Sequence, residues 1–167
     1  MDSAQIESVL RNDKHTVGLS QIGVYPCDKT PKTVTFPSAF VFNTDSSKGP
    51  GRHWVAIYYD RRGHGTYFDS LGGKPFPKTI ENFFLKHGKY HNWINKAVQG
   101  RQSNSCGHYC LQYLIYRARG HSSANIIKRW VQKSVGGYDD KIKCLVTTKY
   151  EYLPRIESEC YNQTSTF

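Results

Sequence analysis

Residues 98–110 read VQGRQSNSCGHYC and place a cysteine, Cys106, seven residues after a glutamine, Gln99. From Cys106 onward, apolar and aromatic residues recur at the three- and four-residue spacing of an amphipathic helix, at Tyr109, Cys110, Tyr113 and Leu114. The pattern predicts a buried helix whose first residue is Cys106.

A cysteine at the start of a helix is well placed for nucleophilic chemistry. The attacking species is the thiolate, and an unperturbed thiol is mostly protonated at neutral pH. The unpaired N–H groups and the dipole of a helix N-terminus lower the pKa of a thiol, and a nearby imidazole does so by accepting its proton. We therefore predict that Cys106 is the nucleophile of a cysteine peptidase.

His53 and Asp69 lie in two segments that we expect to pair as an antiparallel hairpin. Residues 53–60, HWVAIYYD, predict a central strand, and residues 66–70, TYFDS, predict its partner. If the pairing centres near Arg61, His53 lies opposite Asp69, with Cβ atoms about 4.5–5.5 Å apart. A slip of two residues would still leave a diagonal contact. Asp69 would then hold the imidazole in the required orientation.

Gln99 is our candidate donor to the oxyanion of the tetrahedral intermediate, together with the backbone N–H of Cys106. Gln102 is an alternative for this role. Taken singly, each residue has an ordinary explanation, because a helix-opening cysteine is often a buried hydrophobe and an aspartate before two glycines is often a turn residue. The combination of His-Trp, an acid and Gln-x6-Cys-Gly in this order favours catalysis.

Several of these motifs resemble the adenovirus endopeptidase (adenain) family. They are NT at 43–44, GRHWVA at 51–56, YFD at 67–69, VQG at 98–100 and CGHYC at 106–110. The stretch FDSLG at 68–72 is most similar to the shorter protease of Maverick/Polinton elements and adintoviruses, and GVYPCDKTP at 23–31 resembles the early loop of the family. Similar positions run from residue 18 to residue 116, and residues 120–167 resemble nothing in it.

The resemblance implies roles for four residues. Cys106 would be the nucleophile, His53 the general base and then acid, Asp69 the orienting acid, and Gln99 the oxyanion donor. Adenain has glutamate in the acidic position, so the shorter Asp69 must lie slightly closer to His53. The implied fold is papain-like in circularly permuted order, because the chain order here is His, Asp, Cys.

The resemblance also implies substrates and cofactors. The substrates would be capsid or core precursor proteins of a DNA virus or virus-like transposon, cleaved at Gly-containing sites. Double-stranded DNA and a short activating peptide would be cofactors. Adenain binds its peptide through a cysteine, and no cysteine between Asp69 and Gln99 matches it, so Cys27, Cys144 and Cys160 are the remaining candidates.

Composition agrees with this interpretation. The 23 Lys and Arg residues exceed the 13 Asp and Glu residues and give a formal charge of +10, which favours a polyanion such as DNA, with a solvated basic surface as the alternative. The five cysteines lack the spacing of a disulfide framework, so we expect reduced thiols. The sequence contains no set of ligands at zinc-like spacing, so we expect no metal. The sequence shows neither a signal peptide nor a membrane span, so we expect a protein that is not secreted. The resemblance implies a location in the host cell nucleus or cytoplasm and in the virion, and we expect a monomer.

We predict one α+β domain over residues 1–167, with a central antiparallel sheet packed on the nucleophile helix and a candidate flexible tail at 154–167. Further helices are expected at 2–11, 78–87 and 123–134, and strands at 34–44 and 93–98. Residues 139–153 fit either a helix or a strand.

Two other functions are compatible with the motifs. A ubiquitin-like or SUMO-specific protease shares the His-Trp, Asp and Gln-x-Cys-Gly arrangement, although those chains usually have aspartate directly before the cysteine, where this one has Ser105. The other alternative is an inactive, basic DNA-binding protein on a protease scaffold. The intact set of four residues argues against it.

Overall fold

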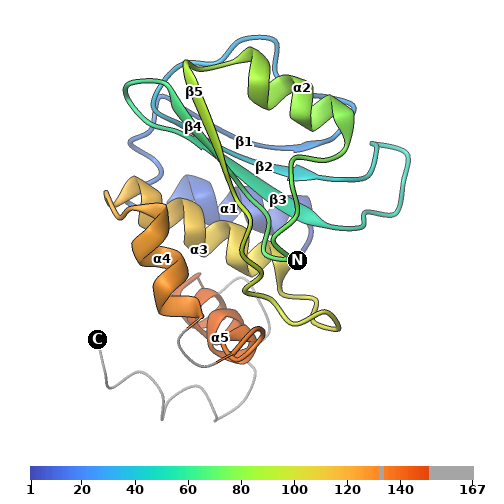
Figure 1. The fold of residues 1–167 in the computed structure, drawn as a ribbon, viewed down its shortest axis with the longest axis vertical. Coiled ribbons are helices and arrows are strands. Elements are labelled where there is room, and N and C mark those ends of the chain that lie inside the picture. The colour runs from blue at the N-terminus through green and yellow to red at the C-terminus, as the bar shows by residue number, and fades with distance from the viewer. Residues whose placement is uncertain (132–133, 151–167) are drawn as a thin grey trace.

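The computed structural model describes residues 1–131 and 134–150, the last three by their backbone alone. Five strands form one sheet in the order β1-β2-β3-β4-β5 (Figure 1). They are β1 (Gln21–Pro26), β2 (Ser38–Asn43), β3 (Trp54–Tyr59), β4 (His64–Phe68) and β5 (Tyr90–Ile94). The predicted α+β class and antiparallel centre are confirmed. Parallel pairing of β1 with β2 and of β4 with β5 makes the sheet mixed, which the sequence did not indicate.

The strand directions bring one end of every strand to the same edge. β3 alone runs opposite to the other four strands. The ends of the four co-directional strands and the start of β3 therefore share one edge, which we call the carboxyl edge. Its strand residues are Pro26, Asn43, Trp54, Phe68 and Ile94.

Helices cover both faces of the sheet. They are α1 (Ser3–Asn12), α2 (Lys78–Lys86), α3 (Cys106–Ala118), α4 (Ser123–Trp130) and α5 (Asp139–Tyr150). α2 lies over one face, α1 and α3 lie over the other, and α4 and α5 lie beyond α3 (Figure 1). α1 begins with the expected capping box, in which Asp2 and Gln5 each bind the other's backbone N–H.

Alternate residues of the central strands feed two separate cores. On β2, Ala39 and Val41 join α1 and α3 in one core, while Phe40 and Phe42 join α2 in the other. Successive strand side chains point to opposite faces, so a strand buried on both faces is apolar along its whole length. All six residues of β2 are buried accordingly.

Several boundaries differ from the predictions. β2 begins only after Pro37, β5 lies at Tyr90–Ile94 rather than at 93–98, and α4 ends at Trp130 rather than at residue 134. Residues 139–150 are helical, which settles that part of the ambiguous segment. The proposed tail at 154–167 lies outside the described residues.

The cysteines agree only in part with the prediction of reduced thiols. Cys27, Cys106 and Cys110 are free, and Cys27 and Cys110 are buried. Cys144 on α5 is disulfide-bonded, so the prediction is wrong for this residue. An odd number of cysteines does not exclude a bridge, because spacing along the chain says little about proximity in the fold.

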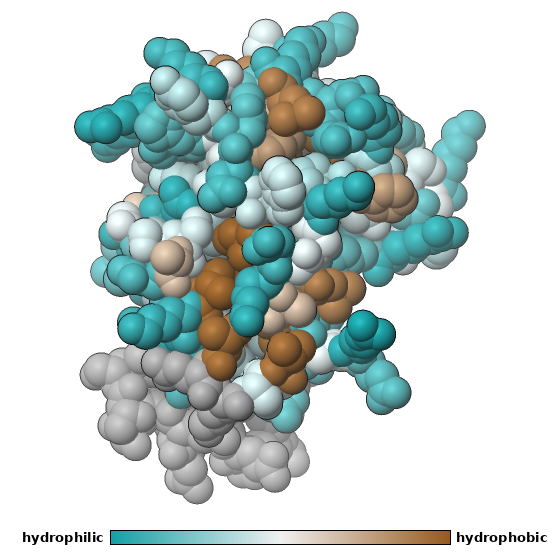
Figure 2. Space-filling model, viewed as in Figure 1, coloured by the Kyte–Doolittle hydropathy of each residue, from teal (hydrophilic) through white to brown (hydrophobic). Residues whose placement is uncertain are grey.

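The surface in the orientation of Figure 1 is mostly hydrophilic, with hydrophobic side chains gathered in its lower half (Figure 2). Within residues 1–131 and 134–150, no helix has the length and apolar content that crossing a bilayer requires.

A matched pair of leucine substitutions tests the core that carries the nucleophile helix. Leu114 on α3 is fully buried, whereas Leu85 on α2 is 52% exposed. Leu114→Ala should lower the free energy of unfolding by about 2–5 kcal/mol, because it removes a buried side chain and leaves a cavity. Leu85→Ala should change it by less than about 0.5 kcal/mol. Urea unfolding of both variants measures the difference, and equal losses would contradict the packing of α3.

Candidate active site

Cys106 is the first residue of α3 and is partly exposed at the carboxyl edge of the sheet. The N-cap residue Ser105 makes no side-chain hydrogen bond to the helix, and its hydroxyl instead lies 2.6 Å from that of Ser103. The first backbone N–H groups of α3 are thus left without a side-chain cap. They lie beside the Cys106 sulfur, as the sequence predicted.

His53 and Asp69 meet across the β3–β4 pair. His53 directly precedes β3 and Asp69 directly follows β4, and Nε2 of the imidazole lies 2.7 Å from Oδ1 of the carboxylate. The register pairs Ala56 with Phe68, so Asp69 is displaced by two residues from direct opposition to His53. The contact is therefore the diagonal one. Asp69 Oδ1 also accepts the Leu71 backbone N–H at 2.8 Å, so the turn explanation for this aspartate holds as well.

The Cys106 thiol and the His53 imidazole form a hydrogen-bonded pair. Because Nε2 of His53 faces Asp69, the nitrogen left for Cys106 is Nδ1. Burial by itself would lower the pKa of His53, but hydrogen bonds and negative charge from Asp69 and Cys106 outweigh burial and raise it to about 9.

The same pairing acts in the opposite direction on the thiol. Burial by itself would raise the pKa of Cys106, but the hydrogen bond and charge of His53 and the backbone N–H groups of Trp54 and Gly107 together lower it. A raised imidazole pKa and a lowered thiol pKa both favour the thiolate–imidazolium state, which is the attacking form of a cysteine nucleophile.

Gln99 lies in the same site, and its side-chain amide is held at both ends. Its Oε1 accepts a hydrogen bond from the Ser70 hydroxyl at 2.6 Å, and its Nε2 donates to the Ser103 carbonyl at 2.6 Å. An amide nitrogen carries two N–H donors, so one remains for another acceptor. Gln102 is exposed and does not line the cleft that contains Cys106, so the structure brings Gln99 to the site and leaves its rival outside.

These side chains open onto a cleft of about 860 Å³. Its lining includes His53, Gln99 and Cys106 on one side, and residues from α1 and from the loop between β2 and β3 elsewhere. The partly exposed Cys106 is thus reached from solvent through this cleft.

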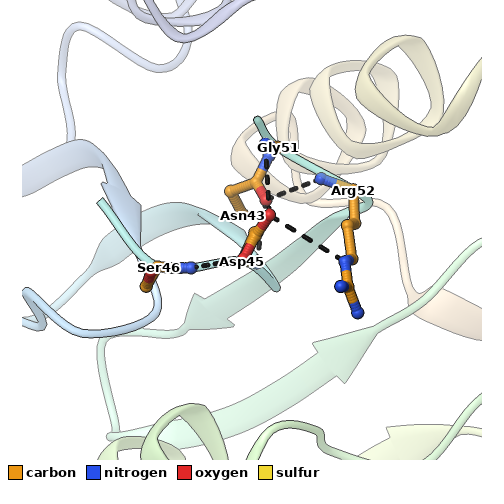
Figure 3. A network of polar contacts seen from close by, with 5 residues as sticks. All are labelled: Asn43, Asp45, Ser46, Gly51 and Arg52. Atoms are coloured by element: carbon orange, nitrogen blue, oxygen red, sulfur yellow. Dashed lines mark hydrogen bonds and ion pairs between the residues drawn. The ribbon is translucent and has the colours of Figure 1, made fainter. Parts of the chain in front are cut away.

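The β2–β3 loop at the rim of this cleft is fixed by polar contacts (Figure 3). Asn43 Oδ1 accepts the backbone N–H groups of Asp45 and Arg52 at 2.9 and 3.1 Å. The Asp45 carboxylate accepts from Ser46 and Gly51 and lies 3.9 Å from the Arg52 guanidinium. Because Arg52 directly precedes His53, this network also fixes the approach of the chain to the imidazole.

Ser70 and Asn43 are site-supporting residues to which the sequence analysis assigned no role. Ser70 follows Asp69 directly and is fully buried, and that adjacency was the available signal. Asn43 was noted only within an NT motif.

Among residues 1–131 and 134–150, no group of three His, Cys, Asp or Glu side chains is arranged to hold a metal ion.

Comparisons with known proteins give partial matches to viral proteases. The cysteine protease S273R of one African swine fever virus isolate is 38% identical over 92 residues, which are 47% of this chain and 32% of that protein. The SUMO-1 cysteine protease S273R of another isolate is 35% identical over 100 residues, which are 52% of this chain and 36% of that protein. The chain thus spans about a third of the length of these relatives.

A crystal structure of the selenomethionine ASFV pS273R protease aligns with a TM-score of 0.48 and 27% identity, over 71% of this chain and 44% of that one. No family model matches the sequence.

The paired pKa shifts predict selective alkylation of Cys106. Iodoacetamide should modify Cys106 at neutral pH well before Cys110, because burial raises the pKa of the Cys110 thiol. His53→Ala should slow the reaction at neutral pH, because the imidazole would then no longer lower the pKa of Cys106. Mass spectrometry of the alkylated peptides across a pH series measures both effects. Equal rates at Cys106 and Cys110 would contradict the thiolate assignment.

Ser70→Ala tests whether Ser70 orients the Gln99 amide. Removal of an oxyanion donor typically lowers the rate about 10²–10³-fold. Loss of the Ser70 hydroxyl should reduce the rate of peptide hydrolysis by no more than this factor. Alkylation of Cys106 should stay close to that of wild type, since it needs no oxyanion donor. Ser46→Ala is the control, at a serine that lines the cleft and does not contact Gln99, and should leave both rates nearly unchanged. A parallel fall of hydrolysis and alkylation would instead indicate damage to the Cys106–His53 pair.

Proposed function

We propose that this chain is a cysteine endopeptidase. The observation that carries the proposal is the contact of His53 with both Asp69 and Cys106 at the N-terminus of α3, which favours a thiolate in an open cleft. The likeness of about half the chain to viral proteins named cysteine proteases supports the same activity.

The proposed reaction proceeds through a covalent thioester. The Cys106 thiolate attacks the scissile carbonyl carbon, and the His53 imidazolium then gives its proton to the leaving amine as the C–N bond breaks. Neutral His53 next takes a proton from water, whose oxygen attacks the thioester. Collapse of this second intermediate releases the carboxylic acid and restores Cys106, while Asp69 holds the imidazole throughout.

Gln99 would stabilise both tetrahedral intermediates. One Nε2 N–H is engaged by the Ser103 carbonyl, so the other would donate to the oxyanion together with the backbone N–H of Cys106. Because Ser70 and Ser103 fix the amide before substrate arrives, little reorganisation accompanies the reaction.

We favour a viral or transposon substrate, namely a capsid or core precursor protein. The support is the adenain-like motifs together with relatives from a DNA virus. The finer resemblance to Maverick/Polinton and adintovirus proteases, a role in virion maturation and a location in the host cell or virion belong to this proposal. Double-stranded DNA, a short activating peptide and a monomeric state stay predictions, of which the charge of +10 supports the first.

Processing of a ubiquitin-like protein is the second candidate. It is favoured by a relative that bears the name SUMO-1 cysteine protease. The two candidates differ in what binds the cleft, since a ubiquitin-like substrate presents a folded body beside its cleaved tail, whereas a precursor site can be an isolated peptide.

A substrate panel separates these functions. Wild type is incubated at low salt with a library of Gly-containing peptides, with and without duplex DNA, and with a SUMO precursor. Cys106→Ala and His53→Ala should abolish turnover, and Gln99→Ala should reduce kcat by about 10²–10³-fold, the cost of one oxyanion donor. Gln102→Ala is the matched control, because this glutamine is exposed outside the cleft.

The pattern of cleavage decides the assignment. Peptide cleavage that DNA accelerates supports the precursor protease, and cleavage of the SUMO precursor alone supports the second candidate. No cleavage of any substrate, together with ordinary thiol reactivity at Cys106, would leave the inactive DNA-binding scaffold and refute the enzyme.

The kcat/KM of wild type should fall as pH rises through about 9, because His53 then loses the proton that the leaving group needs.

A further inference from the structure

We propose that Asp139 is a positioning residue that fixes the oxyanion donor Gln99 through the backbone N–H of the following residue, Gly100. The inference rests on the proposed function and extends the candidate site into α5, a part of the chain to which the family motifs give no role. Asp139 does not touch the cleft and would act only through the backbone next to Gln99.

The first observation is a bridge made by the Asp139 carboxylate. Its Oδ2 accepts the backbone N–H of Gly100 at 3.1 Å, and its Oδ1 lies 2.9 Å from the Tyr109 hydroxyl. Gly100 is the residue after Gln99, and Tyr109 lies one turn beyond Cys106 on α3. One carboxylate thus connects the donor segment to the nucleophile helix.

Tyr109 is suited to donate to this carboxylate. The side chain is fully buried, and burial raises the pKa of its hydroxyl above the ordinary value, with the negative charge of Asp139 acting in the same direction. The phenol therefore keeps its proton. Its hydroxyl is also 3.2 Å from the Val98 carbonyl, so the single proton has two possible acceptors, the Val98 carbonyl and the Asp139 carboxylate.

The second observation is the close approach of two backbones. Gly136, three residues before the first residue of α5, donates its N–H to the Val98 carbonyl at 2.9 Å. A Cβ added to Gly136 would lie 2.8 Å from the Gly100 Cα, closer than real Cβ atoms approach, and its φ of +80° is a conformation that favours glycine. The segment that carries Asp139 is therefore seated directly on residues 98–100.

The third observation is that residues 98–100 have no helix or strand of their own to hold them. The backbone N–H groups of Val98 and Gln99 both donate to the Ser70 carbonyl, at 2.8 and 3.0 Å. The other contacts of the segment come from Gly136, Tyr109 and Asp139. Without those contacts, the peptide plane between Gln99 and Gly100 could turn about the adjoining backbone bonds and carry the Gln99 amide away from Cys106.

Asp139 lies in the first turn of α5. A helix N-terminus stabilises negative charge, and hydrogen bonds to an ionised acceptor are stronger than those between neutral groups. The neighbouring Asp140 has the same charge in the same helix turn but is exposed. It provides the matched control.

The test compares Asp139→Asn and Tyr109→Phe with Asp140→Asn. Hydrolysis is followed with a peptide ending in Gly-Gly-aminomethylcoumarin, inhibition with the corresponding glycinal aldehyde, and thiolate reactivity with iodoacetamide. The aldehyde forms a tetrahedral adduct whose oxyanion uses the donors, whereas alkylation does not use them. Melting temperatures establish that each variant is folded.

Asp139→Asn should lower kcat about 10-fold to 10²-fold, less than loss of the donor itself, with KM little changed. Aldehyde affinity should fall in parallel, while the rate of Cys106 alkylation stays within about twofold. Tyr109→Phe should show a smaller change in the same direction, and Asp140→Asn none. If Asp139→Asn fails to fold, Tyr109→Phe still tests the inference.

Three results would overturn the inference, and they can be told apart. If wild type hydrolyses the peptide and both Asp139→Asn and Tyr109→Phe match it, Asp139 does not position the donor, and the proposed protease stands. A fall of alkylation in step with hydrolysis likewise refutes a role confined to the oxyanion donor. If wild type shows neither hydrolysis nor rapid alkylation of Cys106, the proposed function fails and the inference with it.

Discussion

The end of β4 is the constraint on which the rest of the site depends. Two consecutive residues leave the strand there, and each holds a different half of the site: Asp69 binds the His53 imidazole, and Ser70 binds the Gln99 amide and two backbone N–H groups of its segment. Their positions follow from the antiparallel register of β3 with β4, which both cores lock by burying opposite faces. A slip of one residue would turn both side chains to the wrong face.

The balance of charge and burial explains why this arrangement suits a thiol. Burial disfavours a lone thiolate and a lone imidazolium, because each loses the water that stabilises its charge. Placed side by side, the two opposite charges stabilise each other. Asp69 adds a second negative partner for His53, and the uncapped start of α3 adds N–H groups for the sulfur. Cys110, one helical turn away and without these partners, has its pKa raised. The difference between two cysteines on one helix therefore comes from their neighbours.

The sequence was informative where residue type and spacing act locally. Helical spacing located α3, and the apolar run located β3. The four candidate residues Cys106, His53, Asp69 and Gln99 lie together in the structure. The sequence was uninformative where tertiary contacts decide. β1 contains Gly23 and Pro26 and alternates poorly, and β5 is an edge strand with mostly exposed side chains, so neither gave a clear pattern. The bridges made by Ser70 and Asp139 join segments 29 and 39 residues apart, which no local pattern encodes.

The single reversed strand, β3, has a consequence for how such a protein can change. Residues of β1, β2 and β3 and of the loops after β4 and β5 line the cleft at the carboxyl edge, so a change in the length of those loops would alter the site. The opposite edge carries the exposed turn at Arg61 and Arg62 and none of the candidate catalytic groups. At that far edge, substitutions, insertions or an attached domain should disturb the candidate site least. A fluorescent label or immobilisation tag placed there would leave the entrance to the cleft unobstructed.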